Sequence, residues 1–146
     1  MLKKYSSRRL ARLASIQATY QKLQTDDKID DVVSHFENYH FVDGVLQSRV
    51  EPDMNLFKNI TYGVENHHEE LKNIVSTHLN DQWRVDRLSC ICFCLLLCAV
   101  YELLYEKTPQ SVSINEYIEL SKDFLNDKEI KFINGILDKI LKNNPI

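Results

Sequence analysis

The stretch "SCICFCLLLCAV", Ser89 to Val100, holds all four cysteines of the chain within an apolar run. That run has fourteen residues, Leu88 to Tyr101, Ser89 included, and charged residues bound it on both sides. A membrane-spanning helix needs about 20 consecutive apolar residues, and a shorter run is typical of a helix buried inside a protein. A helix that is apolar all round needs neighbours on every side. The stretch therefore predicts the buried central helix of a helical fold.

The cysteines do not have the arrangement of a metal site. On a helix that turns about 100° per residue, Cys90, Cys94 and Cys98 share one flank, while Cys92 points nearly opposite. The three also climb about 12 Å along the axis, whereas zinc holds its sulfurs at about 2.3 Å. Metal or redox chemistry stays the alternative. We expect free, space-filling cysteines in a reducing, cytoplasmic environment.

The composition favours one all-α domain over residues 1–146. Three glycines and three prolines are few for 146 residues, and this favours helices joined by short polar loops. Apolar spacing and capping residues predict the other helices. We expect them over about residues 7–23 (with Tyr20 on the inner side), 29–40, 53–64, 66–79, 113–124 and 127–141. The "SINE" of Ser113 to Glu116 matches a capping box at the start of the sixth helix.

Charge is distributed unevenly along the chain. The formal net charge is -3, from 18 basic and 21 acidic residues. The first 25 residues hold six of the basic groups and no acid, which leaves a formal -9 for the remainder. The N-terminal end is therefore suited to an anionic partner.

No catalytic motif is found. The sequence has no glycine-rich phosphate loop, no GxSxG and no HExxH. His67 and His68 are adjacent, so on a helix they point about 100° apart and predict a solvated helix start, not a metal site. We expect neither an enzyme nor a cofactor.

The first helix carries the one positive functional signal. Arg8, Arg9 and Arg12 lie within about one helical turn, and Gln17 and Tyr20 follow on the same element. Arginine binds phosphates in bidentate fashion, and amide and aromatic side chains read or stack on unpaired bases. The cluster predicts RNA binding; a solvated basic face is the alternative.

Several ordered blocks resemble the bacterial transcription antitermination factor NusB family. They are "RRLARLASIQATY" from Arg8, "DRLS" from Asp86, "YELL" from Tyr101, "PQSVSINEYIELSKDF" from Pro109 and "FINGILD" from Phe132, with Trp83 besides. The resemblance implies an all-α, seven-helix NusB-like fold, two packed three-helix bundles around a buried central helix. It implies binding to boxA RNA of ribosomal RNA leader transcripts together with ribosomal protein NusE, within an RNA polymerase antitermination complex that suppresses termination. Family members occur as monomers and as dimers.

The resemblance also assigns residues. The RNA-binding set that it implies is Arg8, Arg9, Arg12, Gln17, Tyr20, Lys131, Phe132 and Asn134. For Phe132 the alternative to RNA binding is a position in the core. For Gly135 the alternative is close helix packing, and for Asn115 and Glu116 it is a capping role.

The central helix departs from the family pattern. Cys92, Phe93 and Leu97 stand where the family usually has an acid and two arginines, in the region that meets NusE. We expect these three at a shifted, more hydrophobic or self-associated partner surface. A protein-interaction module with reduced RNA binding is one alternative function. The isolated NusB-like domain of a ribosomal RNA cytosine methyltransferase is another, although the chain ends at Ile146 without the Rossmann-like domain of those enzymes.

Overall fold

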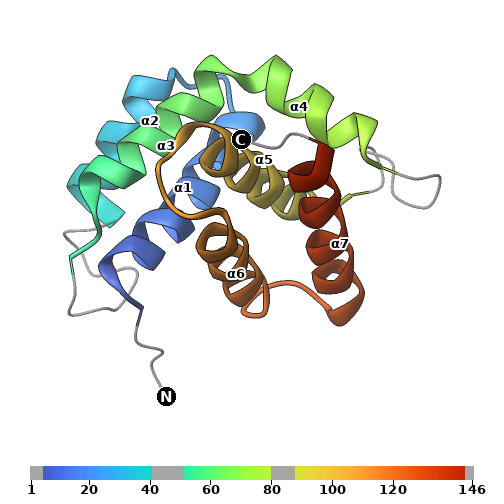
Figure 1. Cartoon of the computed structure of the whole chain (residues 1–146). Helices are drawn as coiled ribbons and strands as arrows, with labels where there is room; N and C mark the ends of the chain where they lie inside the picture. Colours follow the sequence, from blue (N-terminus) through green and yellow to red (C-terminus); the bar gives the residue numbers. More distant parts are fainter. Residues whose placement is uncertain (1–4, 41–50, 80–87, 144–146) are drawn as a thin grey trace.

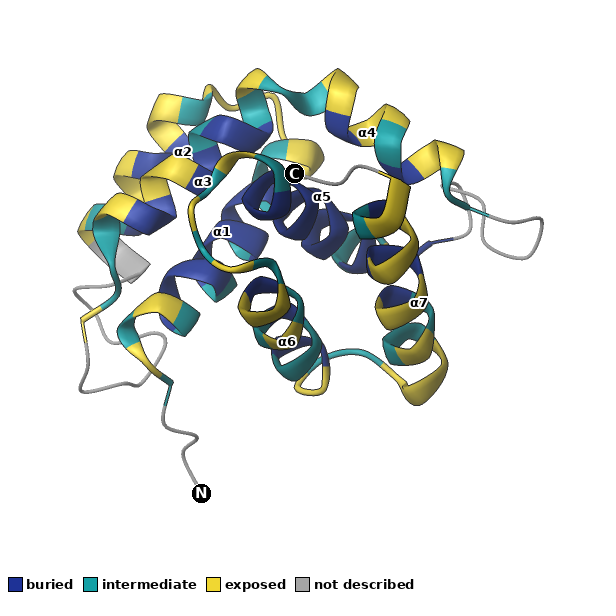
Figure 2. Ribbon diagram, in the orientation of Figure 1, coloured by how far each residue is buried: buried dark blue, intermediate teal, exposed yellow. Residues whose placement is uncertain are grey.

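The apolar stretch forms helix α5, Cys90–Tyr105, which runs through the middle of the molecule (Figure 1). The computed structural model describes residues 5–40, 51–79 and 88–143. Helices α1, α3, α4, α6 and α7 all pack against α5. Figure 2 shows α5 buried along nearly all of its length, while the outer helices are buried only on their inner sides. The prediction of a buried central helix is confirmed.

The described residues form seven α-helices, one π-helical segment and no strand. Their bounds are α1 Ser7–Gln24, α2 Ile29–His35, η1 Phe36–His40, α3 Met54–Asn66, α4 His68–Thr77, α5 Cys90–Tyr105, α6 Gln110–Ser121 and α7 Asp127–Asn143. Helices α1, α2 and α3 pack on one another, as do α5, α6 and α7, and α4 contacts α3, α5 and α7. The predicted all-α, seven-helix class is confirmed.

Polar side chains cap the helices that place the candidate site. Ser6 accepts a hydrogen bond from the backbone N–H of Arg9, and Ser89 accepts one from that of Cys92. At the start of α7, Asn126 accepts from the N–H of Glu129 at 2.8 Å, and Glu129 accepts in return from the N–H of Asn126. This reciprocal pair is a capping box, and it fixes the first turn of α7.

The capping box expected at Ser113 is wrong. Helix α6 begins a turn earlier, because the Pro109 carbonyl already accepts from the N–H groups of Val112 and Ser113. Ser113 is therefore buried inside the helix, and its hydroxyl makes no hydrogen bond with a described residue. Glu116 turns toward α1, so it is not a capping residue either.

Two glycines lie within helices, and their surroundings differ. A methyl group at Gly63 of α3 would overlap the ring of Tyr101 on α5, so this glycine permits close packing of the two helices. Gly135 of α7 is exposed, and a Cβ there would meet nothing within 4 Å among the described residues. The expectation of close helix packing at Gly135 is therefore wrong. Of the residues used for the family resemblance, Trp83, Asp86 and Arg87 lie outside the described residues.

Candidate nucleic-acid interface

The N-terminal end of α1 presents three arginines to three different neighbours. Helix α1 has no acidic residue in its first turn, so the exposed N–H groups and the arginines give that end positive character. The neighbours are carboxylates from distant parts of the chain: Asp53 before α3, Glu102 on α5 and Glu116 on α6. The fold thus brings acids from the body of the chain to the basic end.

Arg12 is the most deeply buried of these arginines. Its side chain is 2% exposed, and its partner Glu102 is 0% exposed. Arg12 Nε donates to both carboxylate oxygens of Glu102, at 3.1 and 3.0 Å, and Nη2 donates to Oε1 at 2.7 Å. Burial opposes the charge, but the hydrogen bonds and the charge of Glu102 outweigh it and raise the pKa of Arg12. Arg12 therefore ties α1 to α5 and presents no surface to RNA, which corrects its assignment as a phosphate contact.

Arg9 is half-buried and forms an ion pair with Glu116 of α6. Its Nε donates to Glu116 Oε2 at 2.7 Å, and Nη1 and Nη2 donate no hydrogen bond to a described residue. The hydrogen bond lowers the pKa of Glu116 and raises that of Arg9. The arginine thus keeps its terminal N–H groups for a further acceptor.

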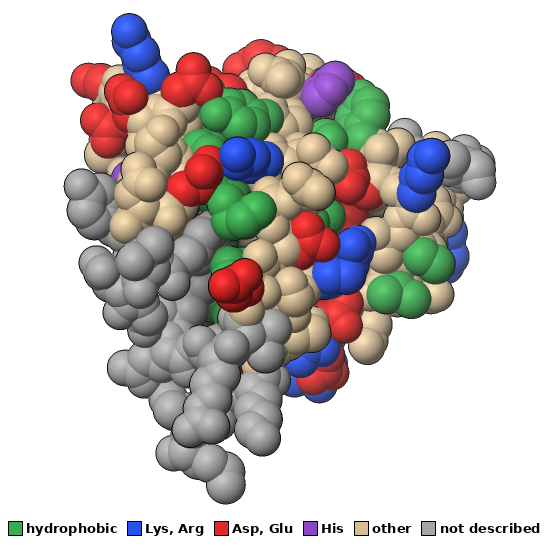
Figure 3. Space-filling view, turned by 90° about the vertical axis from the view of Figure 1, so that its left-hand side faces the viewer, with side chains coloured by type: hydrophobic (Ala, Val, Ile, Leu, Met, Phe, Trp, Pro, Cys, Tyr) green, Lys and Arg blue, Asp and Glu red, His purple; other side chains and the backbone are tan. Residues whose placement is uncertain are grey.

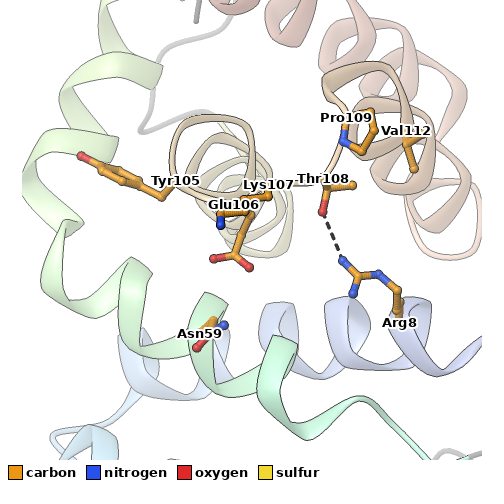
Figure 4. Close-up of a pocket in the computed structure, with 8 residues that line it drawn as sticks. All are labelled: Arg8, Asn59, Tyr105, Glu106, Lys107, Thr108, Pro109 and Val112. Atoms are coloured by element: carbon orange, nitrogen blue, oxygen red, sulfur yellow. Dashed lines mark hydrogen bonds between the residues drawn. The ribbon is translucent and has the colours of Figure 1, made fainter.

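Arg8 is the most exposed of the three, with half of its side chain accessible. Its Nη2 donates to Thr108 Oγ1 at 3.1 Å, and Nη1 lies 3.6 Å from Asp53 Oδ2. Arg8 lines a surface pocket of about 700 Å³. Figure 4 shows Arg8 facing the segment between α5 and α6 that includes Lys107 and Thr108. Arg8 and Arg9 are the two arginines of α1 that a phosphate could reach.

The outer side of α1 continues from Arg9 through Gln17 to Tyr20, at helical spacing. Tyr20 is 41% exposed, which corrects the expectation that it packs inward. Gln17 is half-buried, and its Oε1 makes no hydrogen bond within the described residues. The amide oxygen of Gln17 is itself buried, so the exposed ring of Tyr20 is the part of this side that suits contact with an unpaired base.

The far end of α1 and the start of α7 both contact the start of α5. Gln24 Nε2 donates to Cys90 Sγ at 3.3 Å, and Ser89 Oγ donates to Glu129 Oε2 at 2.9 Å. The partly buried Phe132 lies one turn after Glu129 on the same flank of α7. Phe132 and the Tyr20 end of α1 are therefore linked through the residues at the start of α5.

Lys131 and Asn134 lie on a different flank of α7. They line a groove of about 350 Å³ between α6 and α7, together with Ile118, Lys122 and Leu125 among others. Lys131 is exposed and makes no ion pair with a described residue. The eight residues expected to bind RNA are therefore not one surface: the arginine end of α1 and the α6–α7 groove lie on opposite sides of α6, and Arg12 is internal.

The expected partner residues of α5 are in the core. Cys92 and Leu97 are 0% exposed and Phe93 is 9% exposed. Side chains so enclosed cannot form a partner surface in this conformation, which corrects that assignment. Burial also raises the pKa of the Cys92 and Cys98 thiols to about 12, although the hydrogen bond between Thr19 and Cys98 opposes the shift at Cys98. These thiols stay protonated and are poor nucleophiles and metal ligands.

Other kinds of site receive no support. In residues 5–40, 51–79 and 88–143, no cluster of three or more His, Cys, Asp or Glu side chains could hold a metal ion. No helix in the described part of the chain is long and apolar enough to cross a membrane. Figure 3, which looks onto the side of the molecule that carries α2, shows acidic and basic side chains interspersed. Sequence reasoning missed the acids that pair with the arginines, although "YELL" and "SINE" contain two of them.

The seven helices packed around one apolar helix define a class of small all-α proteins. Residues 9–142 match the NusB family. The chain belongs to the NusB family. It is 34% identical over 137 residues to the transcription antitermination protein NusB of Clostridium botulinum, which covers 93% of this chain and 98% of that protein. That name describes an antitermination protein, in agreement with the expectation that the chain is not an enzyme.

Solved structures show the same fold. A structure of NusB from T. maritima superposes with a TM-score of 0.77 and 27% identity, covering 99% of this chain and 96% of that one. A crystal structure of the antitermination factors NusB and NusE in complex with double-stranded RNA gives a TM-score of 0.75 at 20% identity, covering 93% and 96%. The second likeness is evidence for the fold alone.

Proposed function

We propose that the chain is a cytoplasmic transcription antitermination factor that binds boxA RNA of ribosomal RNA leader transcripts together with ribosomal protein NusE. It would act within an RNA polymerase complex to suppress termination. Membership of the NusB family supports this function, because the related C. botulinum protein carries the antitermination name. A protein of the same fold was solved with NusE and double-stranded RNA, and the proposal extends partners of these two kinds to this chain.

The observation that carries the RNA proposal is the pair Arg8 and Arg9 at the N-terminal end of α1. Both side chains keep accessible N–H groups there, next to backbone N–H groups that no acidic residue of the first turn neutralises. Such a helix end attracts phosphate, and arginine adds charge-assisted hydrogen bonds. In this proposal Gln17, Tyr20, Lys131, Phe132 and Asn134 supply further contacts, and Arg12 supplies none.

The test is binding of a fluorescent boxA RNA, followed by anisotropy over a range of salt concentrations. The wild type should bind with an affinity that falls steeply as salt rises, because phosphate contacts release counterions. The Arg8→Ala/Arg9→Ala variant should bind more weakly and with a smaller salt slope. A Lys58→Ala/Lys72→Ala variant removes two charges from exposed sites on α3 and α4 and should bind like wild type. Equal affinities of the arginine variant and the wild type would exclude this interface.

NusE binding needs its own measurement. Size-exclusion chromatography of the chain with NusE, with and without boxA RNA, should give a complex that elutes earlier than either protein. The same experiment on the chain alone reports its oligomeric state. The alternative of an interaction module without RNA is less favoured, since it was based on changed charges at Cys92, Phe93 and Leu97, which are buried.

A further inference from the structure

The outer side of α7 carries four lysines in helical register. Lys128, Lys131, Lys139 and Lys142 are all exposed, and Gly135 lies in the middle of the series. The steps between successive members are three or four residues, so all five positions lie on one side of the helix. The row, called here the lysine stripe, is about 21 Å long at 1.5 Å per residue.

The acids of α7 differ in how close they come to the lysine stripe. Asp127 lines the groove between α6 and α7 that Lys131 also lines, Asp138 lines the wider groove beside it, and Glu129 turns toward Ser89 at the start of α5. Lys142 pairs with Asp138 at 3.3 Å, in a largely exposed pair that is weak in water. Lys131 and Lys139 make no ion pair with a described residue. In a chain of net charge -3, Lys131 and Lys139 therefore form a local basic surface on either side of Gly135.

Gly135 adds an independent observation. A glycine inside a helix costs stability relative to alanine, because it loses more conformational freedom on folding. At Gly63 that cost has an internal reason, the ring of Tyr101, but around Gly135 the described residues leave the space open. The bare backbone at the centre of the lysine stripe suits a ligand that approaches closely from outside.

We propose that the RNA strand extends along the outer side of α7, with its phosphates on the lysine stripe and its closest approach at Gly135. The inference rests on the proposed RNA-binding function. It extends the RNA-contacting surface of α7 from Lys131 to Lys142. A phosphodiester backbone is the fitting occupant, because it presents a row of single negative charges to a row of lysines. Lys131 belongs both to the proposed RNA-binding residues and to the stripe, so one strand can pass from those residues along α7.

The test compares two RNAs, boxA alone and boxA extended by about ten nucleotides at each end, with binding measured across salt. Lys139→Gln should weaken binding of the extended RNA several-fold and lower the salt slope by about 0.7, the value for one phosphate of a single strand. Lys72→Gln, an equal charge change on exposed α4, is the matched control and should bind like wild type. Gly135→Gln should stay folded by circular dichroism and yet bind the extended RNA several-fold more weakly.

The outcomes separate the two proposals. If the wild type binds neither RNA, the proposed function fails and this inference fails with it. If the wild type binds while Lys139→Gln matches Lys72→Gln, or while folded Gly135→Gln binds as tightly as wild type, only the inference is overturned. Loss of NusE binding by Lys139→Gln with unchanged RNA binding would also overturn it, since the stripe would then serve a protein.

Discussion

The guanidinium of Arg12 and the carboxylate of Glu102 form three hydrogen bonds of 2.7 to 3.1 Å inside the core, although 90 residues separate them in sequence. Replacing Arg12 leaves Glu102 as a buried, unpaired charge, and replacing Glu102 leaves the buried Arg12 with the carboxylate of Glu116, 4.0 Å from its Nη1. We therefore expect Arg12→Ala or Glu102→Ala to lower the free energy of unfolding by about 3–5 kcal/mol. Urea unfolding followed by circular dichroism measures this.

The matched control for the buried pair is a joint apolar replacement. Arg12→Met together with Glu102→Leu removes both charges, and its free energy of unfolding should lie well above that of either single variant. Arg8→Ala should cost less than about 1 kcal/mol, since its contacts are half exposed. If Arg12→Ala proved as mild as Arg8→Ala, the pair would not be buried as described.

The pair Arg9 and Glu116 predicts an acid-dependent part of the stability. Because the hydrogen bond from Arg9 lowers the pKa of Glu116, the contribution of the pair is complete above the ordinary pKa of 4.5 and is lost as pH falls through the lowered value. Urea unfolding of wild type and Glu116→Gln should therefore differ most near pH 7 and converge at strongly acidic pH. Arg9→Ala should remove the same component, and a constant difference at all pH values would contradict the assignment.

Tyr20 offers a test of base stacking within the proposed function. Its ring is 41% exposed, so Tyr20→Ala should change the free energy of unfolding by no more than about 0.5 kcal/mol. Stacking on an RNA base is worth about 1–3 kcal/mol, so the same variant should bind boxA RNA roughly five- to a hundredfold more weakly. Tyr20→Phe keeps the ring and should bind nearly as wild type. Equal losses for the two variants would point to the hydroxyl instead.

The buried thiols predict alkaline instability. Burial raises the pKa of Cys92 and Cys98 from 9.0 to about 12, and that of Cys94 upward as well. Between pH 9 and 12 a thiol loses its proton in the unfolded chain but keeps it in the folded protein. Its contribution to the free energy of unfolding is therefore complete below pH 9 and is lost as pH rises toward 12. The free energy of unfolding should therefore fall above pH 9, by about 1.4 kcal/mol per pH unit for each buried thiol.

Thiol labelling at neutral pH tests the burial of the cysteines, on which the alkaline instability depends. Cys90 is only partly buried, so one thiol per chain should react with a chromogenic disulfide reagent in the folded state. The other three should react only after unfolding in urea. Fast reaction of more than one thiol in the native protein would show that the core around α5 opens readily.

The two helical glycines predict opposite effects of the same substitution. Gly63→Ala forces a methyl group into the ring of Tyr101 and should destabilise by about 1–3 kcal/mol. Gly135→Ala meets open space on a helix and should stabilise by about 0.5–1 kcal/mol. Thermal melting of both variants beside wild type measures the pair. Destabilisation by Gly135→Ala would mean that this glycine has a structural role within the chain.

Much of the fold could be predicted because its signals are local. The apolar run of α5 and the caps at Ser6, Asp53 and Ser89 each depend on residues within a turn or two. The start of α6 could not be placed from Ser113 to Glu116 alone, since a serine and a glutamate three apart also fit a helix interior. Tertiary packing decided the partner of Glu116, which accepts a hydrogen bond from Arg9, 107 residues away in sequence.

The sequence by itself determined an all-helical fold around one apolar helix, the basic character of α1 and membership of the NusB family. These follow from periodicity, charge and ordered motifs, which are properties of the chain in any conformation. Only the tertiary structure decided that Arg12 is internal while Arg8 remains accessible, that Cys92, Phe93 and Leu97 are enclosed, and that Gly135 is open. Burial and ion pairing depend on which distant segments meet, and a linear pattern does not contain that information.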